Sequence, residues 1–187
     1  MDGFDIVQER STHVNLVNRI RSVMQDQVEK HFNKGVDFAR CGEYAKAVTS
    51  FDMALEIEPD NDMLWVLRGS MLDDLVQYPD ALNSYDKALA IKPDYAVAWY
   101  NRGVVLRKLG RYLDAIDSFD RALALNPDYA DAKKHREHAI REQDTTPEDH
   151  KTYGIVEQKN HTANRDEKSN RLRMQVEQQS GQVQIAR

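Results

Sequence analysis

Two histidines, His135 and His138, lie three residues apart in a stretch with helical periodicity, and Glu142 follows one turn further on. Imidazole and carboxylate groups at this spacing share one side of a helix, and both are ligands for Zn²⁺. A structural zinc site needs four ligands, and the sequence offers no evident fourth. We therefore predict a solvated helix face here and no metal site.

The other reactive side chains do not form a catalytic group either. Cys41 follows Arg40 directly before a glycine turn, which is more typical of a small turn residue than of an activated thiolate. Asp73 and Asp74 are interpreted as a solvated helix end. Residues 160–162, Asn-His-Thr, have the form of a glycosylation acceptor, but no secretory signal accompanies them. The sequence predicts no enzymatic activity and no cofactor.

Composition restricts the class of partner. The chain has 187 residues and a net charge of -5, which argues against nucleic acid, because phosphate binding depends on a surplus of Lys and Arg. The acidic N-terminus lacks an apolar signal region, and no stretch approaches the ~18 apolar residues of a membrane span. The single cysteine fits a reducing compartment. We expect a cytoplasmic protein without a membrane span.

A repeat of 34 residues organises the middle of the chain, and a fixed period of this length indicates an array of supersecondary units. Six columns of like residues recur in three copies: Gly35, Gly69 and Gly103; Tyr44, Tyr78 and Tyr112; Ala47, Ala81 and Ala115; Phe51, Tyr85 and Phe119; Ala54, Ala88 and Ala122; Pro59, Pro93 and Pro127.

Each copy has the pattern of two helices. A glycine inside the first helix costs roughly 1 kcal/mol relative to alanine, so we predict that the second helix crosses there with no room for a side chain. Gly42 and Gly110 occupy the turn between the helices, whereas the second copy has Val76 at this position. A β-branched residue avoids the left-handed conformation, so we predict that this turn closes differently.

Two further columns change along the array. His31 occupies the position of Trp65 and Trp99, which indicates that the first copy packs against something other than a preceding repeat. We expect three basic side chains to cover apolar surface with their stems and reach water with their charges: Lys34, Arg68 and Arg102.

The tryptophan at the start of the first helix, the glycine four residues later, the turn tyrosine and the Ala, Phe/Tyr, Ala and Pro positions together resemble the tetratricopeptide repeat. The sequence of residues 98–103 resembles that of bacterial members of the family, and the resemblance to the repeat covers residues 28–129. It implies an all-α, right-handed solenoid of helical hairpins with a concave groove lined by the first helices. Its functional content is limited to protein binding, because one fold serves many functions.

The predicted organisation has six parts. They are an N-terminal amphipathic helix at 1–27, repeats at 28–61, 62–95 and 96–129, a cap helix at 130–143 and a polar, mostly disordered tail at 144–187 with short strand-like alternations.

The N-terminal helix carries apolar residues in steps of three and four, at Val14, Val17, Ile20, Met24 and Val28. It either continues into the first repeat helix or breaks near Asp26 and folds back as a cap on the array. A third possibility is a coiled-coil or partner-binding helix, which includes the pairing of two chains as a homodimer through residues 12–26.

The concave groove is the predicted site of function, and most of its side chains are apolar or aromatic, which suits an amphipathic helix or an extended apolar peptide of a protein partner. Its predicted residues are Phe32, Asn33, Val36, Met63, Val66, Leu67, Val97, Tyr100, Asn101, Val104 and Lys108. We predict an adaptor, scaffold or chaperone. Occupation of the groove by the chain's own N- or C-terminal segment, and simple packing of these residues between helices, remain open alternatives.

Family members that bind the C-terminal carboxylates of heat-shock chaperones use a clamp of Lys, Arg and Asn. The matching positions here hold Phe32, Val36, Leu67, Val97 and Asn101, so we expect this binding mode to be absent. A secretion-type chaperone is the alternative within the same class, because such proteins are small, acidic arrays with an apolar groove.

Overall fold

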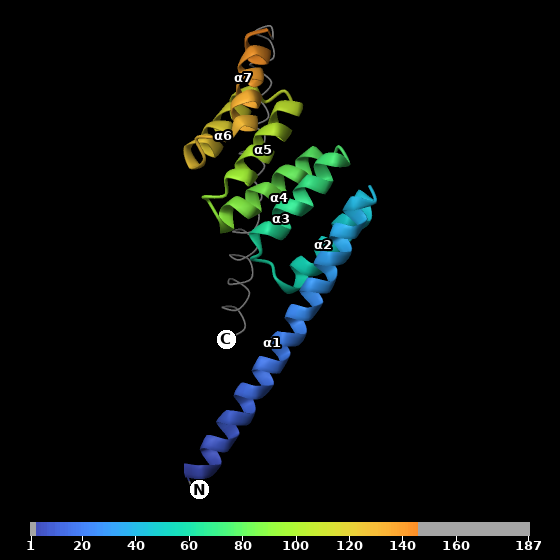
Figure 1. Cartoon of the computed structure of the whole chain (residues 1–187), viewed down its shortest axis with the longest axis vertical. Coiled ribbons are helices and arrows are strands. Elements are labelled where there is room, and N and C mark those ends of the chain that lie inside the picture. The colour runs from blue at the N-terminus through green and yellow to red at the C-terminus, as the bar shows by residue number, and fades with distance from the viewer. Residues whose placement is uncertain (1–2, 146–187) are drawn as a thin grey trace, which may run out of the picture. The chain divides into compact units, whose positions relative to one another are not determined.

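The computed structural model describes residues 3–145 and the side chains from residue 15 onward (Figure 1). This part is entirely α-helical, with helices α1 (Gly3–Arg40), α2 (Tyr44–Ile57), α3 (Asp62–Asp74), α4 (Tyr78–Ile91), α5 (Ala96–Lys108), α6 (Tyr112–Leu125) and α7 (Ala130–Thr145). The chain divides into two units, 1–141 and 142–187. The predicted tail lies, from residue 146 on, outside the described residues.

The helices are arranged as a series of hairpins. The pairs α1–α2, α3–α4 and α5–α6 pack most extensively, and α2 with α3 and α4 with α5 join one hairpin to the next. The α-solenoid of helical hairpins predicted from the repeat is thereby confirmed, and α7 stands where the first helix of a further hairpin begins.

The glycine column marks the place where the helices of each hairpin cross. A Cβ atom added at Gly35 would lie 2.6 Å from Cε1 of Phe51. The corresponding distances are 2.7 Å from Gly69 to Tyr85 and 2.7 Å from Gly103 to Phe119. Because real Cβ atoms do not approach carbon atoms so closely, only glycine fits at this crossing, as predicted.

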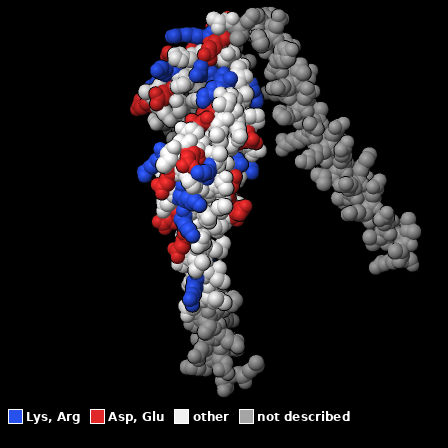
Figure 2. Space-filling view, turned by 90° about the vertical axis from the view of Figure 1, so that its right-hand side faces the viewer, with Lys and Arg blue, Asp and Glu red and all other residues white. Residues whose placement is uncertain are grey.

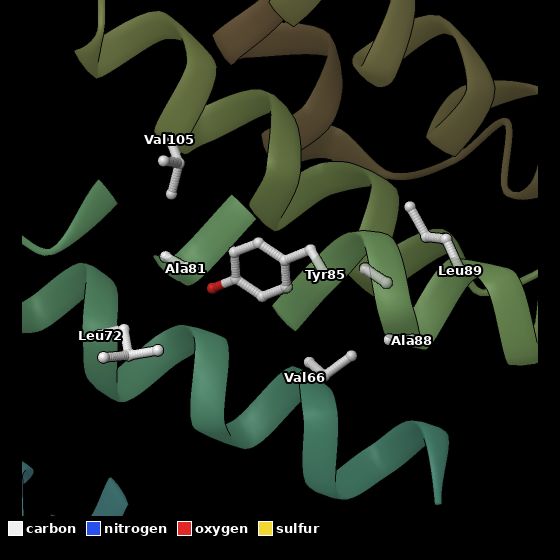
Figure 3. Packing of buried hydrophobic residues seen from close by; sticks show 8 residues of the cluster. Val66, Leu72, Ala81, Tyr85, Ala88, Leu89 and Val105 are labelled. Carbon is white, nitrogen blue, oxygen red and sulfur yellow. The ribbon is translucent and has the colours of Figure 1, made fainter. Parts of the chain in front are cut away.

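The repeated alanine and aromatic columns form the core. Ala81, Tyr85 and Ala88 of α4 are buried together with Val66 and Leu72 of α3 (Figure 3). Val105 and Ala98 of α5 complete the same cluster, so the core continues from one hairpin into the next. Such continuity is what an array needs, since each hairpin alone cannot bury its apolar face.

Helix α1 is continuous from Gly3 to Arg40. Of the two arrangements considered for the N-terminal segment, the structure therefore has the one that continues into the first repeat helix. The segment does not fold back over the array, and it does not occupy a groove of its own chain. Its N-terminal part extends beyond the hairpins (Figure 1).

The turn at Val76 corrects the sequence prediction. Val76 has a φ of 61°, close to the 74° of Gly42 and the 72° of Gly110. Its amide donates to Asp73 O at 2.9 Å and the Gln77 amide donates to Leu72 O at 2.8 Å, the same pattern as at Gly110. The turn closes as in the other hairpins because packing of α3 on α4 outweighs the cost of a left-handed valine.

Replacement of Val76 by glycine should therefore stabilise the protein by about 1 kcal/mol. A left-handed L-residue costs roughly 1–2 kcal/mol, and the greater conformational entropy of glycine in the unfolded state offsets part of the gain from removing this cost. Urea unfolding followed by circular dichroism measures the change. The matched control is Gly110→Val, which should destabilise by a similar amount. If the Val76→Gly variant were less stable than the wild type, the inference that the backbone at Val76 is strained would be wrong.

Candidate functional site

The candidate site is the first-helix face, which we define as the predicted groove residues on α1, α3 and α5. Asn33, Met63, Val97 and Lys108 are exposed on it. The remaining accessible members are half-buried: Phe32, Val36, Leu67, Tyr100, Asn101 and Val104.

The structure brings these residues together in two groups. Phe32, Val36 and Leu67 pack against the same buried cluster, which lies between the first and second hairpins. Tyr100 and Val104 pack against the cluster around Phe119. The half-buried residues thus serve two purposes: one side of each stabilises the hairpins, and the other remains accessible.

Val66 does not belong to the site. It is only 6% exposed and lies in the core between α3 and α4, where Figure 3 shows it beside Tyr85 and Ala88. The sequence prediction placed it in the groove from the repeat geometry, in the same column as Phe32 and Tyr100. Valine is shorter than these aromatic side chains, so at this position it stays within the core.

Lys108 is engaged within the site. Its Nζ donates to both carboxylate oxygens of Asp73, at 2.7 and 2.9 Å, and so links α5 to α3. The Asp73 side chain is only 18% exposed, which corrects its interpretation as part of a solvated helix end. Burial, together with the carboxylate of Asp73, raises the pKa of neighbouring Asp74. The Lys108–Asp73 pair itself therefore adds no net charge to the first-helix face.

The sequence did not reveal the partner of Lys108, because these two residues come from different repeats and do not occupy equivalent columns. The only available signal was that the first helices all end at the same side of the array. This places the last turn of α3 near that of α5.

Aromatic side chains cluster where α5 meets α7. The ring of Tyr100 lies 4.9 Å from that of Tyr129 and 5.6 Å, edge-on, from the imidazole of His135, measured between centroids. Phe119 closes the cluster at 6.0 Å from Tyr100. Burial is the main cause that raises the pKa of Tyr100, with Asp131 adding to it. This cluster fixes one end of the first-helix face.

His135 is part of this aromatic packing. Within the described residues, no group of three or more His, Cys, Asp or Glu is close enough to hold a metal ion. Cys41 is exposed and not in a disulfide. None of the helices between residues 3 and 145 is apolar enough over sufficient length to cross a membrane.

An arginine ladder joins successive hairpins and was not anticipated from the sequence. Arg68 Nε donates to Asp52 of the preceding hairpin at 2.6 Å, and its Nη1 donates to Ser84 of its own hairpin at 2.7 Å. Arg102 repeats this with Asp86 and Ser118. The guanidinium groups thus bind defined partners and do not simply extend into water. The signal was present, since both partner types recur with the 34-residue period.

Helical hairpins with glycine, alanine and aromatic columns at this period define a helical-repeat protein. Part of the array matches models of this repeat class: residues 96–129 match the model of the tetratricopeptide repeat, and residues 74–110 match a second model described as TPR repeat. No curated protein sequence matches the chain at a significant level.

Solved structures of tetratricopeptide domains share the fold. The Arabidopsis OM64 TPR domain is 24% identical with a TM-score of 0.62, and the match covers 63% of this chain and 98% of that one. The first TPR of Spaghetti (RPAP3), bound to an HSP90 peptide, is 21% identical with a TM-score of 0.63, covering 64% and 95%. The TPR2B domain of yeast Sti1, in a pHsp70 complex, is 16% identical with a TM-score of 0.59, covering 62% and 97%.

The position of His135 generates a pH prediction. Burial is the main cause that lowers its pKa, and Arg107 and His138 act in the same direction while Asp131 opposes them. A histidine whose pKa is lower in the folded than in the unfolded state contributes full stability above its unfolded pKa, near 6.5, and loses it as the pH falls through that value. The stability should therefore decline between about pH 7.5 and 5.5.

The variant His135→Phe should show a shallower decline than the wild type over this range, measured by urea unfolding at each pH. Tyr129→Phe is the control from the same aromatic cluster, because its hydroxyl does not titrate in this range, and it should keep the wild-type slope. Equal slopes for wild type and His135→Phe would show that another group carries the dependence.

Proposed function

We propose that the chain is a non-catalytic protein-interaction module whose first-helix face binds an apolar helix or an extended apolar peptide of a partner. The observation that supports this is the exposure of apolar side chains on a face otherwise built from half-buried ones. Met63 is 45% exposed and Val97 is 41% exposed. Exposed apolar groups gathered on one face are typical of interaction sites.

The charge of the face supports an apolar partner over an acidic one. Lys108 is already paired with Asp73. The positions at which chaperone-binding family members hold their clamp of Lys, Arg and Asn carry Phe32, Val36, Leu67, Val97 and Asn101 here, none of them cationic. The RPAP3 relative is bound to the peptide SRMEEVD, which ends in a largely acidic segment. Burying such carboxylates against apolar side chains, without cations to pair with them, would cost free energy.

Two amides complete the proposed site. Asn33 is exposed on α1 and Asn101 is half-buried on α5. A side-chain amide both donates and accepts hydrogen bonds, so each can pair with the backbone of a bound segment. Apolar contact would then supply most of the affinity, and the amides would position the peptide.

The test uses the full chain and two fluorescent peptides, a neutral leucine-rich amphipathic helix and the acidic SRMEEVD. We expect the neutral helix to bind and the acidic peptide not to bind. The double variant Met63→Glu, Val97→Glu should weaken binding of the neutral helix by at least about tenfold, because each change removes an apolar contact and adds a charge that must be desolvated. Fluorescence anisotropy gives the dissociation constants.

Leu113→Glu is the matched control, because Leu113 is 64% exposed on α6, away from the first helices. It should bind the neutral helix like the wild type. Both residues of the double variant are exposed, so its circular dichroism and melting should be nearly unchanged. Tighter binding of SRMEEVD than of the neutral helix, or unaltered binding by the double variant, would refute the proposed site.

A further inference from the structure

A second apolar surface lies on α1, outside the first-helix face. Five large side chains of this helix are between 41% and 55% exposed: Leu16, Val17, Ile20, Val23 and Met24. With 3.6 residues per turn, their spacing of three and four places them along one side of the helix. We call this side the free face of α1. It belongs to the part of α1 that extends beyond the hairpins (Figure 1).

The same side of α1 continues into the first repeat at His31 and Lys34, which are 11 and 14 residues beyond Ile20 and so nearly whole numbers of turns away. In later repeats the equivalents of His31 contact the preceding repeat. Trp65 Nε1 donates to Pro59 O at 2.7 Å, and Trp99 Nε1 donates to Pro93 O at 2.8 Å. His31 Nδ1 is buried and has no hydrogen-bond partner among the described residues.

Lys34 also lacks the partner that its equivalents have. Arg68 and Arg102 each bind an aspartate on the second helix of the preceding hairpin, and Arg136 of α7 binds Asp120 in the same way. No carboxylate of the described chain lies within ion-pair distance of Lys34. Its Nζ instead lies 5.6 Å from the ring centroid of Phe38. Among the described residues, Lys34 therefore lacks the aspartate partner that the equivalent basic residues have.

The exposure of Lys30 also indicates that a preceding helix is missing from the described chain on this side of α1. Its equivalents Leu64, Ala98 and Ala132 are at most 1% exposed, since each packs on the preceding hairpin. Lys30 is exposed. A helix that covered this side of α1 would meet two lysines, Lys30 and Lys34, in addition to the apolar stripe.

We propose that the free face of α1 docks an amphipathic helix of a partner protein, with an apolar stripe against Leu16 to Met24 and acidic side chains against Lys30 and Lys34. This helix takes the place of the second helix of a preceding hairpin. From Leu16 to Lys34 the face extends about 27 Å at 1.5 Å per residue, which a helix of about 18 residues spans. Its own backbone or side chains also supply an acceptor near His31.

Charge distinguishes this partner from a second copy of the chain. Residues 15–26 contain two exposed arginines, Arg19 and Arg21, one beside each edge of the stripe, and one acidic residue, Asp26, at the C-terminal end. In Figure 2, the surface just above the lower grey atoms is mostly white, with Lys or Arg side chains in blue. Pairing of two copies through residues 12–26 would bring together two segments that each carry two arginines and one aspartate, whereas an acidic-flanked helix complements the basic excess.

The test uses the full chain and two synthetic 18-residue amphipathic helices with the same leucine stripe, one flanked by Glu and one by Lys. The Glu peptide should bind at least about tenfold more tightly than the Lys peptide, and added salt should reduce the difference. The double variant Ile20→Gln, Val23→Gln should weaken the Glu peptide by about tenfold through loss of apolar contact. Lys30→Glu with Lys34→Glu should reverse the preference between the peptides.

The first-helix variant Met63→Glu, Val97→Glu separates the two surfaces, because it should leave binding of the Glu peptide to α1 unchanged. All substituted residues are exposed, and circular dichroism checks the helix content of each variant. Equal binding of both peptides, or binding insensitive to the α1 variants, would overturn the proposal. So would a wild-type dimer in light scattering that Ile20→Gln, Val23→Gln converts to a monomer, since a second copy would then occupy the face.

Discussion

The close approach of a glycine to an aromatic ring is the constraint on which the whole array depends. At Gly35, Gly69 and Gly103 even one additional carbon would meet the facing ring at 2.6 to 2.7 Å. The two helices of each hairpin can therefore cross in only one relative position, with the ring seated on the backbone of the first helix. Because this position is the same in all three hairpins, every other contact in the array can recur with the same period.

The arginine ladder is one consequence of this recurrence. Arg68 reaches Asp52 and Ser84, which lie 16 residues before and after it, and Arg102 reaches its own partners at the same separations. A single guanidinium thus bonds the preceding hairpin and its own at once. Hydrogen bonds to a charged group add to stability, although exposed ion pairs contribute little by themselves. The ladder mainly fixes how one hairpin is placed on the next.

The periodic part of this structure was predictable from the sequence, because one physical cause, the crossing at glycine, acts on three copies and is visible as a column. Residues outside the columns were not. Val76 was predicted to alter its turn, yet the packing of α3 on α4 imposes the left-handed conformation, and a rule based on the valine alone does not include that packing. Val66 and Lys108 were assigned to the groove from the repeat geometry, but burial and an ion pair between different repeats decide their roles.

The two ends of the array differ in what they can accept. On α7, Glu137 stands at the column of the glycines and is exposed. A side chain at this position fills the space in which the aromatic ring of a second helix sits, so α7 cannot accept a second helix by the same crossing. The opposite holds at α1, which is already paired with its second helix, α2. The described chain lacks the second helix of a preceding hairpin at this end. Such a helix would supply a carbonyl for His31 and a carboxylate for Lys34. The array is therefore closed to extension at α7 in its own geometry, while α1 retains an apolar stripe and basic groups on the side where a further helix would pack. This asymmetry is why a helix supplied by another protein fits at the α1 end.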